Sequence, residues 1–324
     1  MRHLTLAALT AATVTAGNAG AETLKMATIE PSLGQAITMA TFANVGNSNQ
    51  GAVDIEVAGG GAATVHQLET ARGNLDMFMV SPTIYNFFSK GVAMYQNEAE
   101  APELARNVAL LMWFPYGQYH YAVRGESDIE VLDDIEGTTV FLGPAGGGAF
   151  NASAGWIEAT TGLVVGEDYE AITANWATGF QAFQDGKVDM YVNGCIDPCQ
   201  QFIQFTETET IRFIGPEDHS GEAVEKFLGT FRYLAEVPAG LYENQVNEAP
   251  VMSNDTAVGI GVRADLDEDT VYQVTKAFWD NLDSITSDAP WAKALNLEFA
   301  VQSLAGMPLH PGAARYYREI GALN

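Results

Sequence analysis

Two glycine-rich loops are the segments best suited to hold a ligand. Gly59-Gly60-Gly61 follows a strand-like stretch, and Gly143-Pro144-Ala145-Gly146-Gly147-Gly148 precedes a helix-like one. Glycines let backbone N–H groups converge on an anion, and a helix N-terminus adds a favourable dipole. The second loop lacks the Lys-Ser/Thr pair of a nucleotide-binding P-loop. We predict ligand contacts from both loops, with tight turns that bind nothing as the alternative. The predicted residues are Gly60, Gly61, Gly146, Gly147 and Gly148.

Polar and aromatic side chains near these loops extend the predicted site. Ser81 and Asn193 each stand at the end of an apolar, strand-like segment, which is where open α/β sheets bind ligands. Asn151 lies one turn into the helix expected after the second glycine loop. Trp113 and Trp176 are predicted to form cleft walls, although packing in the core is the commoner role of such residues.

Catalytic or metal chemistry has little support in the sequence. It contains no Gly-x-Ser-x-Gly elbow and no HExxH motif, and its histidines are scattered. Asp265-x-Asp267-x-Asp269 imitates the opening of a calcium loop, but Thr270 and Lys276 occupy the places of its glycine and glutamate. Arg124 and Arg212 have the chemistry to bind a carboxylate, but a structural ion pair is the commoner role. We predict no catalytic residue, no cofactor and no metal.

The two cysteines of the chain are Cys195 and Cys199. In an oxidising compartment they are able to form a disulfide, which would stabilise less than one that closes a long loop. Their spacing is not the CxxC of redox or zinc motifs, and no second pair completes a metal site. A local disulfide and two free thiols both remain open.

Strand and helix patterns alternate along the chain, which predicts an α/β fold with parallel sheets. Two strands, 119–124 and 256–263, bracket a central block. We therefore predict a discontinuous first lobe (22–123 with 256–324) and a second lobe (124–255), joined by two hinge segments. The other expected strands are 24–28, 53–57, 75–80, 138–142, 188–192 and 211–214. The expected helices are 35–47, 63–72, 149–161, 179–184 and 270–282.

The N-terminus resembles a secretory signal peptide. A basic start is followed by an apolar run to Ala16 and by the small residues Asn18-Ala19-Gly20-Ala21, which predicts cleavage after Ala21 and export. The 324 residues include 15 basic and 41 acidic ones, and the net charge of −26 repels nucleic-acid phosphates. No basic cluster favours anionic lipid. We expect neither a nucleic-acid partner nor embedding in a membrane.

Several segments together resemble the solute-binding receptors of tripartite ATP-independent periplasmic (TRAP) transporters, specifically the TAXI-type group. They include Ala58-Gly59-Gly60-Gly61-Ala62 and Val237-Pro238-Ala239-Gly240-Leu241-Tyr242. Further segments follow in the family's order at 123–137, 141–151, 184–189 and 263–281. The resemblance implies a type II periplasmic binding protein-like fold of two lobes, each with a central sheet flanked by helices.

The family's opening loop corresponds to residues 27–34, which here lack its glycines and its tyrosine pair. Because that loop lines the cleft in such receptors, the resemblance implies ligand contacts from Thr28 and Ser32.

The resemblance also implies a function. It is that of a monomeric periplasmic receptor, without enzymatic activity, that closes its hinge around a small carboxylate-bearing metabolite. An acidic amino acid or a 2-oxo or dicarboxylate is expected, with delivery to a polytopic membrane permease. A receptor of an ABC importer or a sensor, and a secreted enzyme on the same scaffold, remain alternatives.

Overall fold

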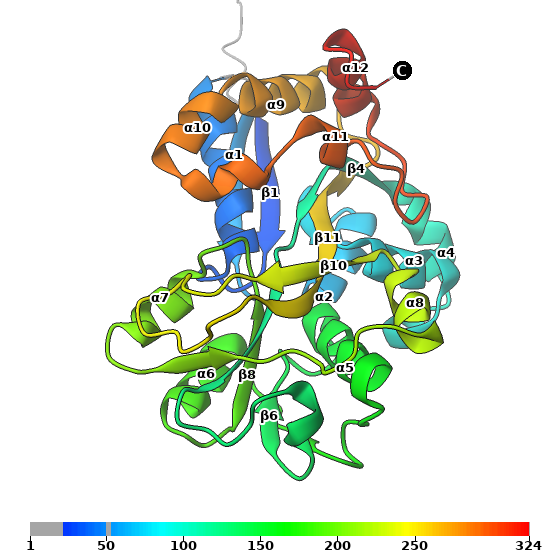
Figure 1. Cartoon of the computed structure of the whole chain (residues 1–324). Helices are drawn as coiled ribbons and strands as arrows, with labels where there is room; N and C mark the ends of the chain where they lie inside the picture. The colour runs from blue at the N-terminus through cyan, green and yellow to red at the C-terminus, as the bar shows by residue number, and fades with distance from the viewer. Residues whose placement is uncertain (1–21, 50–52, 324) are drawn as a thin grey trace, which may run out of the picture.

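Two β-sheets organise the chain, one in each half of the molecule (Figure 1). The computed structural model describes residues 22–49 and 53–323. The predicted signal peptide, residues 1–21, lies outside the described residues.

Two strands of the first sheet, β3 (Met77–Val80) and β4 (Val108–Pro115), are buried along nearly their whole length, as is typical of strands covered on both faces. The order of this sheet is β10–β11–β3–β1–β2, and β4 also pairs with β11. The pairs of β1 with β2 and with β3 are parallel, whereas β11 runs antiparallel to β3, β4 and β10. The strands are β1 (Glu22–Thr28), β2 (Val53–Gly59), β3 (Met77–Val80), β4 (Val108–Pro115), β10 (Arg232–Val237) and β11 (Val251–Arg263).

The second sheet has the order β7–β6–β8–β5–β9. β6 is parallel to β7 and β8, and β5 is antiparallel to β8 and β9. The strands are β5 (Tyr119–Arg124), β6 (Thr139–Phe141), β7 (Glu170–Ala171), β8 (Met190–Gly194) and β9 (Ile211–Phe213).

Helices cover both sheets and supply aromatic side chains to their cores. Phe42 packs against Phe278 on the first sheet, and Trp156 packs against Phe227 near the second, with ring centroids 5.2 and 5.5 Å apart. The helices of the first half are α1 (Gly34–Asn49), α2 (Ala63–Ala71), α3 (Pro82–Lys90), α4 (Ala101–Leu104), α9 (Glu268–Asp280), α10 (Leu282–Asp288), α11 (Leu297–Ala300) and α12 (Pro311–Glu319). Those of the second half are α5 (Gly148–Thr161), α6 (Trp176–Gln184), α7 (Gln200–Thr206) and α8 (Glu222–Leu228).

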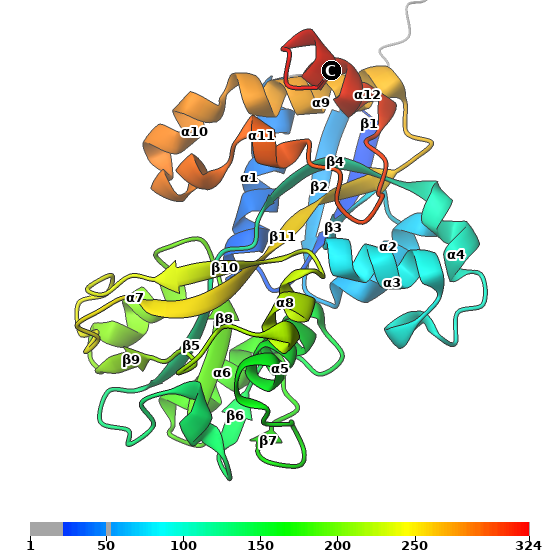
Figure 2. The same ribbon diagram turned by 45° about the vertical axis from the view of Figure 1, so that its right-hand side comes forward.

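The chain passes between the two sheets at two places. Residues 116–118 connect β4 of the first sheet with β5 of the second. Residues 214–231 lead back from β9 of the second sheet to β10 of the first, which pairs with the N-terminal part of the long strand β11 (Figure 2). The division into lobes at 123/124 and 255/256 stays a prediction, and the pairing of β5 favours a first boundary at 116–118 instead.

The α/β alternation expected from the sequence is confirmed, but the expectation of parallel sheets holds only in part. β1, β2 and β3 are parallel, as are β6, β7 and β8. By contrast, β11 runs antiparallel to β3, β4 and β10, and β5 runs antiparallel to β8 and β9. Both sheets are therefore mixed.

Candidate functional site

The two glycine-rich loops face the same cavity. This first cavity has a volume of about 280 Å³ and is lined by Gly60 and Gly61, which follow β2, and by Gly147 and Gly148 at the start of α5. Gly60 and Gly61 have φ angles of 100° and 85°, a left-handed backbone that favours glycine. One loop belongs to each half of the molecule, so the cavity lies between the two sheets.

The N-terminus of α5 presents free backbone donors to the first cavity. The Gly147 N–H is used within the loop, since it donates to the Pro144 carbonyl at 3.0 Å. The N–H groups of Gly148 and Ala149, which also line the cavity, have no hydrogen-bond partner in the described part of the chain. Unpaired N–H groups at a helix N-terminus favour a negatively charged or acceptor group.

Several other predicted residues line the first cavity while serving local structure. The Ser81 hydroxyl caps α3, accepting the Ile84 N–H at 3.2 Å. The Asn151 side chain donates to the Gly147 carbonyl at 2.9 Å. Trp176 packs edge-on against Phe141, with ring centroids 5.5 Å apart. The sequence analysis missed a neighbour, Asn175, which lines the cavity and caps α6 by accepting the Thr178 N–H at 2.8 Å.

Arg232, at the start of β10, is the most informative residue that the sequence analysis missed. It lines the first cavity, and no carboxylate among the described residues lies within 4.0 Å of its guanidinium. The group donates to the Thr230 hydroxyl and lies 4.4 Å from the centroid of the Phe227 ring. Burial lowers the pKa of Arg232 from its ordinary value. The guanidinium is a partly buried cation with no counter-ion among the described residues, which is unfavourable unless a ligand supplies one.

The backbone next to Arg232 is strained. Phe231 has a φ angle of 66°, a left-handed conformation that is unusual for a bulky side chain. Strain of this kind gathers at binding sites because the surrounding structure must hold it in place. Phe231 directly precedes Arg232, the first residue of β10.

Direct contacts join the two halves at the edge of the first cavity. The Thr83 hydroxyl of α3 donates to the Thr230 carbonyl at 3.2 Å. A Cβ atom added to Gly148 would lie 3.1 Å from the Cδ1 atom of Ile84. The absence of a side chain at Gly148 therefore permits this close approach of α5 to α3.

A second cavity, of about 160 Å³, lies beside the disulfide between Cys195 and Cys199. Ser32 and Asn193 line this cavity and not the first. Gln35 of α1 also lines it and donates to the carbonyls of Tyr116 and Gly194, at 2.7 and 2.9 Å. That side chain bridges the first half of the molecule, the 116–118 connection and the end of β8.

Three predicted ligand contacts lie in neither cavity lining as the structure describes it. Thr28 and Trp113 are each only 1% exposed, because both side chains point into the core of the first sheet. Gly146 has a φ angle of 74° and serves the turn before α5. The ligand roles predicted for Thr28, Trp113 and Gly146 thus have no support from these cavities.

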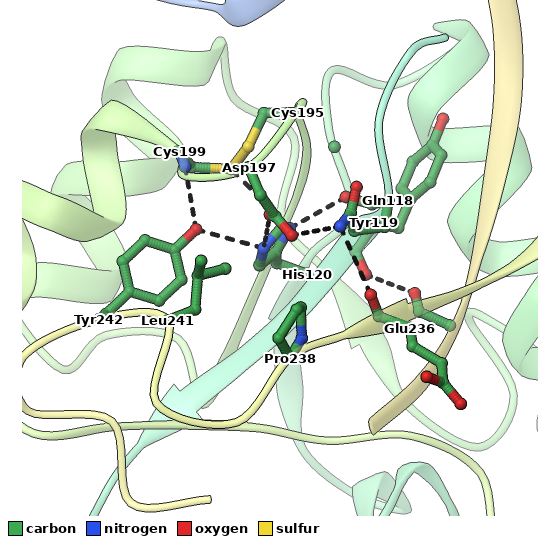
Figure 3. Close-up of polar contacts among 12 residues, drawn as sticks. Gln118, Tyr119, His120, Cys195, Asp197, Cys199, Glu236, Pro238, Leu241 and Tyr242 are labelled. Carbon is green, nitrogen blue, oxygen red and sulfur yellow. Dashed lines mark hydrogen bonds and ion pairs between the residues drawn. A yellow bond between two sulfur atoms is a disulfide. The ribbon is translucent and has the colours of Figure 1, made fainter. Parts of the chain in front are cut away.

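The disulfide loop, residues 195–199, is anchored by a buried polar network that we call the hinge cluster (Gln118, His120, Asp197, Cys199 and Tyr242; Figure 3). The two ring nitrogens of His120 lie 2.9 Å from the Gln118 carbonyl and 3.0 Å from the Asp197 carboxylate. The Tyr242 hydroxyl accepts the Cys199 N–H at 2.9 Å. Gln118 also donates to Asp197. The cluster ties the loop to the first passage between the sheets.

The hinge cluster places sulfur, imidazole and carboxylate together, as in a thiol nucleophile or a metal site. His120 Nδ1 lies 3.8 Å from the Cys199 Sγ atom, and the ligand atoms of His120, Cys195 and Cys199 fall within 4.8 Å of one another. Because the sulfurs are joined, neither is available as a thiolate nucleophile or ligand. In this oxidised form the cluster is structural.

Replacing Cys195 and Cys199 together by alanine is expected to lower the free energy of unfolding by about 2 kcal/mol. The crosslink closes a loop of only a few residues, so the chain-entropy term is small. Urea unfolding of the double variant and of the wild type measures the difference, and wild type reduced before unfolding is the control. Equal stability of the oxidised wild type and the variant would contradict the expectation.

The two arginines named in the sequence analysis hold structure together. Arg124 forms ion pairs with Glu126 and Glu209. Arg212 donates to the carbonyls of Ser127 and Ile129, at 2.8 and 3.3 Å. Neither arginine lines the first cavity. Both therefore have a structural role, and the structure gives no support for binding of a ligand carboxylate by either.

Asp255, on β11, makes folding stability depend on pH. Its carboxylate accepts the Gly117 N–H at 3.0 Å, and burial raises its pKa from 3.8 to about 7. Between these two pKa values the carboxyl group of Asp255 is protonated in the folded state and ionised in the unfolded chain. This contribution to stability is complete below about pH 4 and is lost as the pH rises through about 7.

Asp255→Asn is expected to flatten this dependence. The free energy of unfolding of the variant should match that of the wild type near pH 4 and exceed it by roughly 1–2 kcal/mol near pH 8. The difference is small because the Asp255 side chain is partly exposed and solvent weakens the effect. Urea unfolding at several pH values checks it. If the variant keeps the slope of the wild type between about pH 4 and 7, another group is responsible.

With this geometry established, comparison with known proteins identifies the family. A family model described as the NMT1-like family matches residues 32–321. The chain belongs to the NMT1-like family.

Solved structures show the same fold for this NMT1-like chain. The alkanesulfonate-binding protein SsuA from Xanthomonas axonopodis pv. citri, bound to MOPS, matches with a TM-score of 0.52 and 14% identity, over 94% of this chain and 86% of that one. A TRAP periplasmic solute-binding protein from Sulfitobacter sp. NAS-14.1, with bound β-D-galacturonate, has a TM-score of 0.48 and 12% identity, over 92% and 94%. The likeness to SsuA, at 14% identity, establishes the fold alone, which is the bilobal fold of periplasmic solute-binding proteins.

Among the described residues, no helix combines the length and the apolar character needed to cross a bilayer.

Proposed function

We propose that this protein is a receptor that captures a small organic anion between its two lobes and delivers it to a membrane permease. The observation that carries the proposal is the first cavity, where a partly buried arginine, without a counter-ion in the described part of the chain, meets glycine loops from both halves. A cavity of this size, with an apolar lining and few polar groups, is typical of small-molecule sites. Membership of the NMT1-like family and the bilobal fold support the same function.

The finer assignment is to the TAXI-type receptors of TRAP transporters, with a carboxylate-bearing metabolite as ligand. It is supported by the sequence segments that resemble that group. Arg232 is a suitable partner because a guanidinium binds a carboxylate through two parallel hydrogen bonds. The same group also suits a sulfonate.

The proposed mechanism is hinge closure. A ligand that contacts both lobes binds the closed form better than the open form, and this difference shifts the population towards closure. The Thr83–Thr230 hydrogen bond and the approach of Ile84 to Gly148 are contacts that a closed form makes and an open form loses. The 116–118 connection and β11 are the candidate hinges.

The place of action follows from the same proposal. The signal peptide expected at residues 1–21 would direct the chain to the periplasm, where it acts as a monomer and meets a polytopic permease. Binding without turnover is the expected chemistry, since the His120–Cys199 pair is locked by the disulfide and lies outside the first cavity.

The first test is whether the protein retains a solute. Native mass spectrometry of the freshly purified mature chain should detect a bound organic acid that is released on unfolding and restored unchanged on refolding. Chemical conversion of that compound by the protein would favour the secreted enzyme.

The second test separates the transport classes. In cells that lack the gene, uptake of the retained acid should be lost and should return with the gene. If the receptor serves a TRAP system, uptake should survive ATP depletion. Loss of uptake on ATP depletion would indicate an ABC importer. Unchanged uptake in the deletion strain would favour a sensor, which binds the solute without transporting it.

A further inference from the structure

The first cavity has an unusual balance of charge for a protein this acidic. Among the lining residues that the structure describes, only Glu30 and Arg232 carry a full charge. Neither has an oppositely charged side chain within 4.0 Å in the described part of the chain. Arg232 can neutralise one acid group. A second acid group on the ligand would find no second cation there and would be repelled by Glu30.

Glu30, Thr64, Ser81 and Thr83 of the first half line the cavity, but the same half also contributes an apolar wall. Its residues come from the ends of β1 and β3, from α3 and the segment after it, and from β11. They are Ile29, Met79, Ile84, Phe87, Met94 and Val258. Two of them are methionines, whose flexible side chains fit ligands of varied shape. This surface favours an uncharged hydrocarbon body, because burying a charged or hydroxylated body against it leaves polar groups unpaired.

The hydrogen-bond donors of the lining come from both halves. They are Arg232, on β10 of the first sheet, and, in the second half, the free N–H groups of Gly148 and Ala149 and the side chain of Asn175. The cavity therefore combines an apolar face with an acceptor-binding face. A ligand that satisfies both faces has one polar end and one apolar end.

We propose that the ligand is an amphipathic mono-acid, with one carboxylate or sulfonate group paired to Arg232 and a hydrocarbon body against the wall of Ile84, Phe87 and Met94. This inference rests on the proposed receptor function and narrows it. It replaces the acidic amino acids and dicarboxylates expected from the sequence resemblance. Glu30 acts as the residue that selects against a second acid group.

Calorimetric titration of the mature chain with matched compounds tests the inference. The probes are hexanoate, its di-acid analogue adipate, and the uncharged hexanamide, with butanoate, octanoate and hexanesulfonate to vary the body and the acid. Hexanoate should bind at least about tenfold more tightly than adipate and hexanamide. Tighter binding of adipate, equal binding of hexanamide, or no binding of any mono-acid in the series would overturn the inference.

A pair of variants locates the discrimination. Glu30→Gln should strengthen binding of adipate and leave that of hexanoate nearly unchanged, because it removes repulsion that only the di-acid experiences. Glu56→Gln is the matched control, an exposed glutamate of β2 outside the cavity lining, and it should change neither affinity. If Glu30→Gln and the wild type had the same ratio of hexanoate affinity to adipate affinity, the selecting role of Glu30 would be contradicted.

The retained solute separates failure of this inference from failure of the proposed function. If mass spectrometry identifies a sugar, an amino acid or a di-acid that binds in the first cavity, the mono-acid inference is wrong and the receptor function stands. If the protein retains no solute and none of the probes binds, both are wrong. Identification of a mono-acid supports both.

Discussion

Arg232→Met is expected to weaken binding of the ligand by roughly 30- to 5,000-fold, since truncating one partner of a buried charge pair costs about 2–5 kcal/mol of binding free energy. Methionine keeps much of the length of the side chain and removes the charge. The stability of the ligand-free variant should equal or exceed that of the wild type. Arg232 is partly buried there with no counter-ion in the part of the chain that the structure describes, so its loss removes an unfavourable term. Titration with hexanoate and urea unfolding measure the two effects.

Arg212→Met is the matched control for this prediction. Arg212 lies in the second half, outside the first cavity, and holds the carbonyls of Ser127 and Ile129. Its replacement should lower the unfolding free energy by about 1–3 kcal/mol and leave ligand affinity unchanged. The account would be contradicted if Arg232→Met bound like the wild type, or if it lost as much stability as Arg212→Met.

The second large effect is expected at Gly148, where a side chain should keep the lobes apart. In Gly148→Leu the Cβ atom alone would lie 3.1 Å from Ile84 Cδ1, and the rest of the side chain would enter the contact between α5 and α3. Overpacking of this kind costs roughly 1–3 kcal/mol, which predicts ligand binding weakened roughly 5- to 150-fold. Stability without ligand should change little, because an open form does not make the contact.

Two further variants test this explanation. Gly229→Ala places a methyl group at an exposed position with an ordinary φ of −60° and should bind as the wild type does. Adding Ile84→Val to Gly148→Ala removes the Cδ1 atom that the new Cβ meets, so the pair should bind more tightly than Gly148→Ala alone. Wild-type affinity in Gly148→Leu would mean that closure does not bring Ile84 and Gly148 together. Gly148 is a sharper test than Gly147, where an added Cβ would meet the Pro144 carbonyl of its own loop.

The glycine loops were predictable because their chemistry is local. A run of small residues between a strand pattern and a helix pattern marks a turn that ends at a helix N-terminus, and that is where Gly147 and Gly148 lie. The elements on both sides were found for the same reason. For example, the helix expected at 149–161 is observed at 148–161.

Arg232 was not predictable from its neighbours in the sequence. It opens β10, a strand that was not among those expected from the sequence, and the pairing of β10 with β11 brings it to the cavity. The one available signal was the scarcity of basic residues, 15 against 41 acidic ones, which leads one to expect an acidic partner for each. Only the structure shows that Arg232 has no acidic partner among the described residues.

Strand ends were weaker guides than glycine loops. Ser81 and Asn193 both follow apolar strands, yet Ser81 lines the first cavity and Asn193 the second. Strand direction does not separate them, because β3 and β8 each have one parallel and one antiparallel neighbour. The difference lies in which distant segments pack at each strand end, and a single sequence does not reveal these segments.

A crystal structure of the mature protein with bound hexanoate tests the central claim most directly. The account predicts the carboxylate within about 3 Å of the Arg232 guanidinium and the hydrocarbon chain against Ile84 and Phe87, with Gly60–Gly61 and Gly147–Gly148 on either side. Hexanoate bound elsewhere, or bound in this cavity with its carboxylate away from Arg232, would contradict the account.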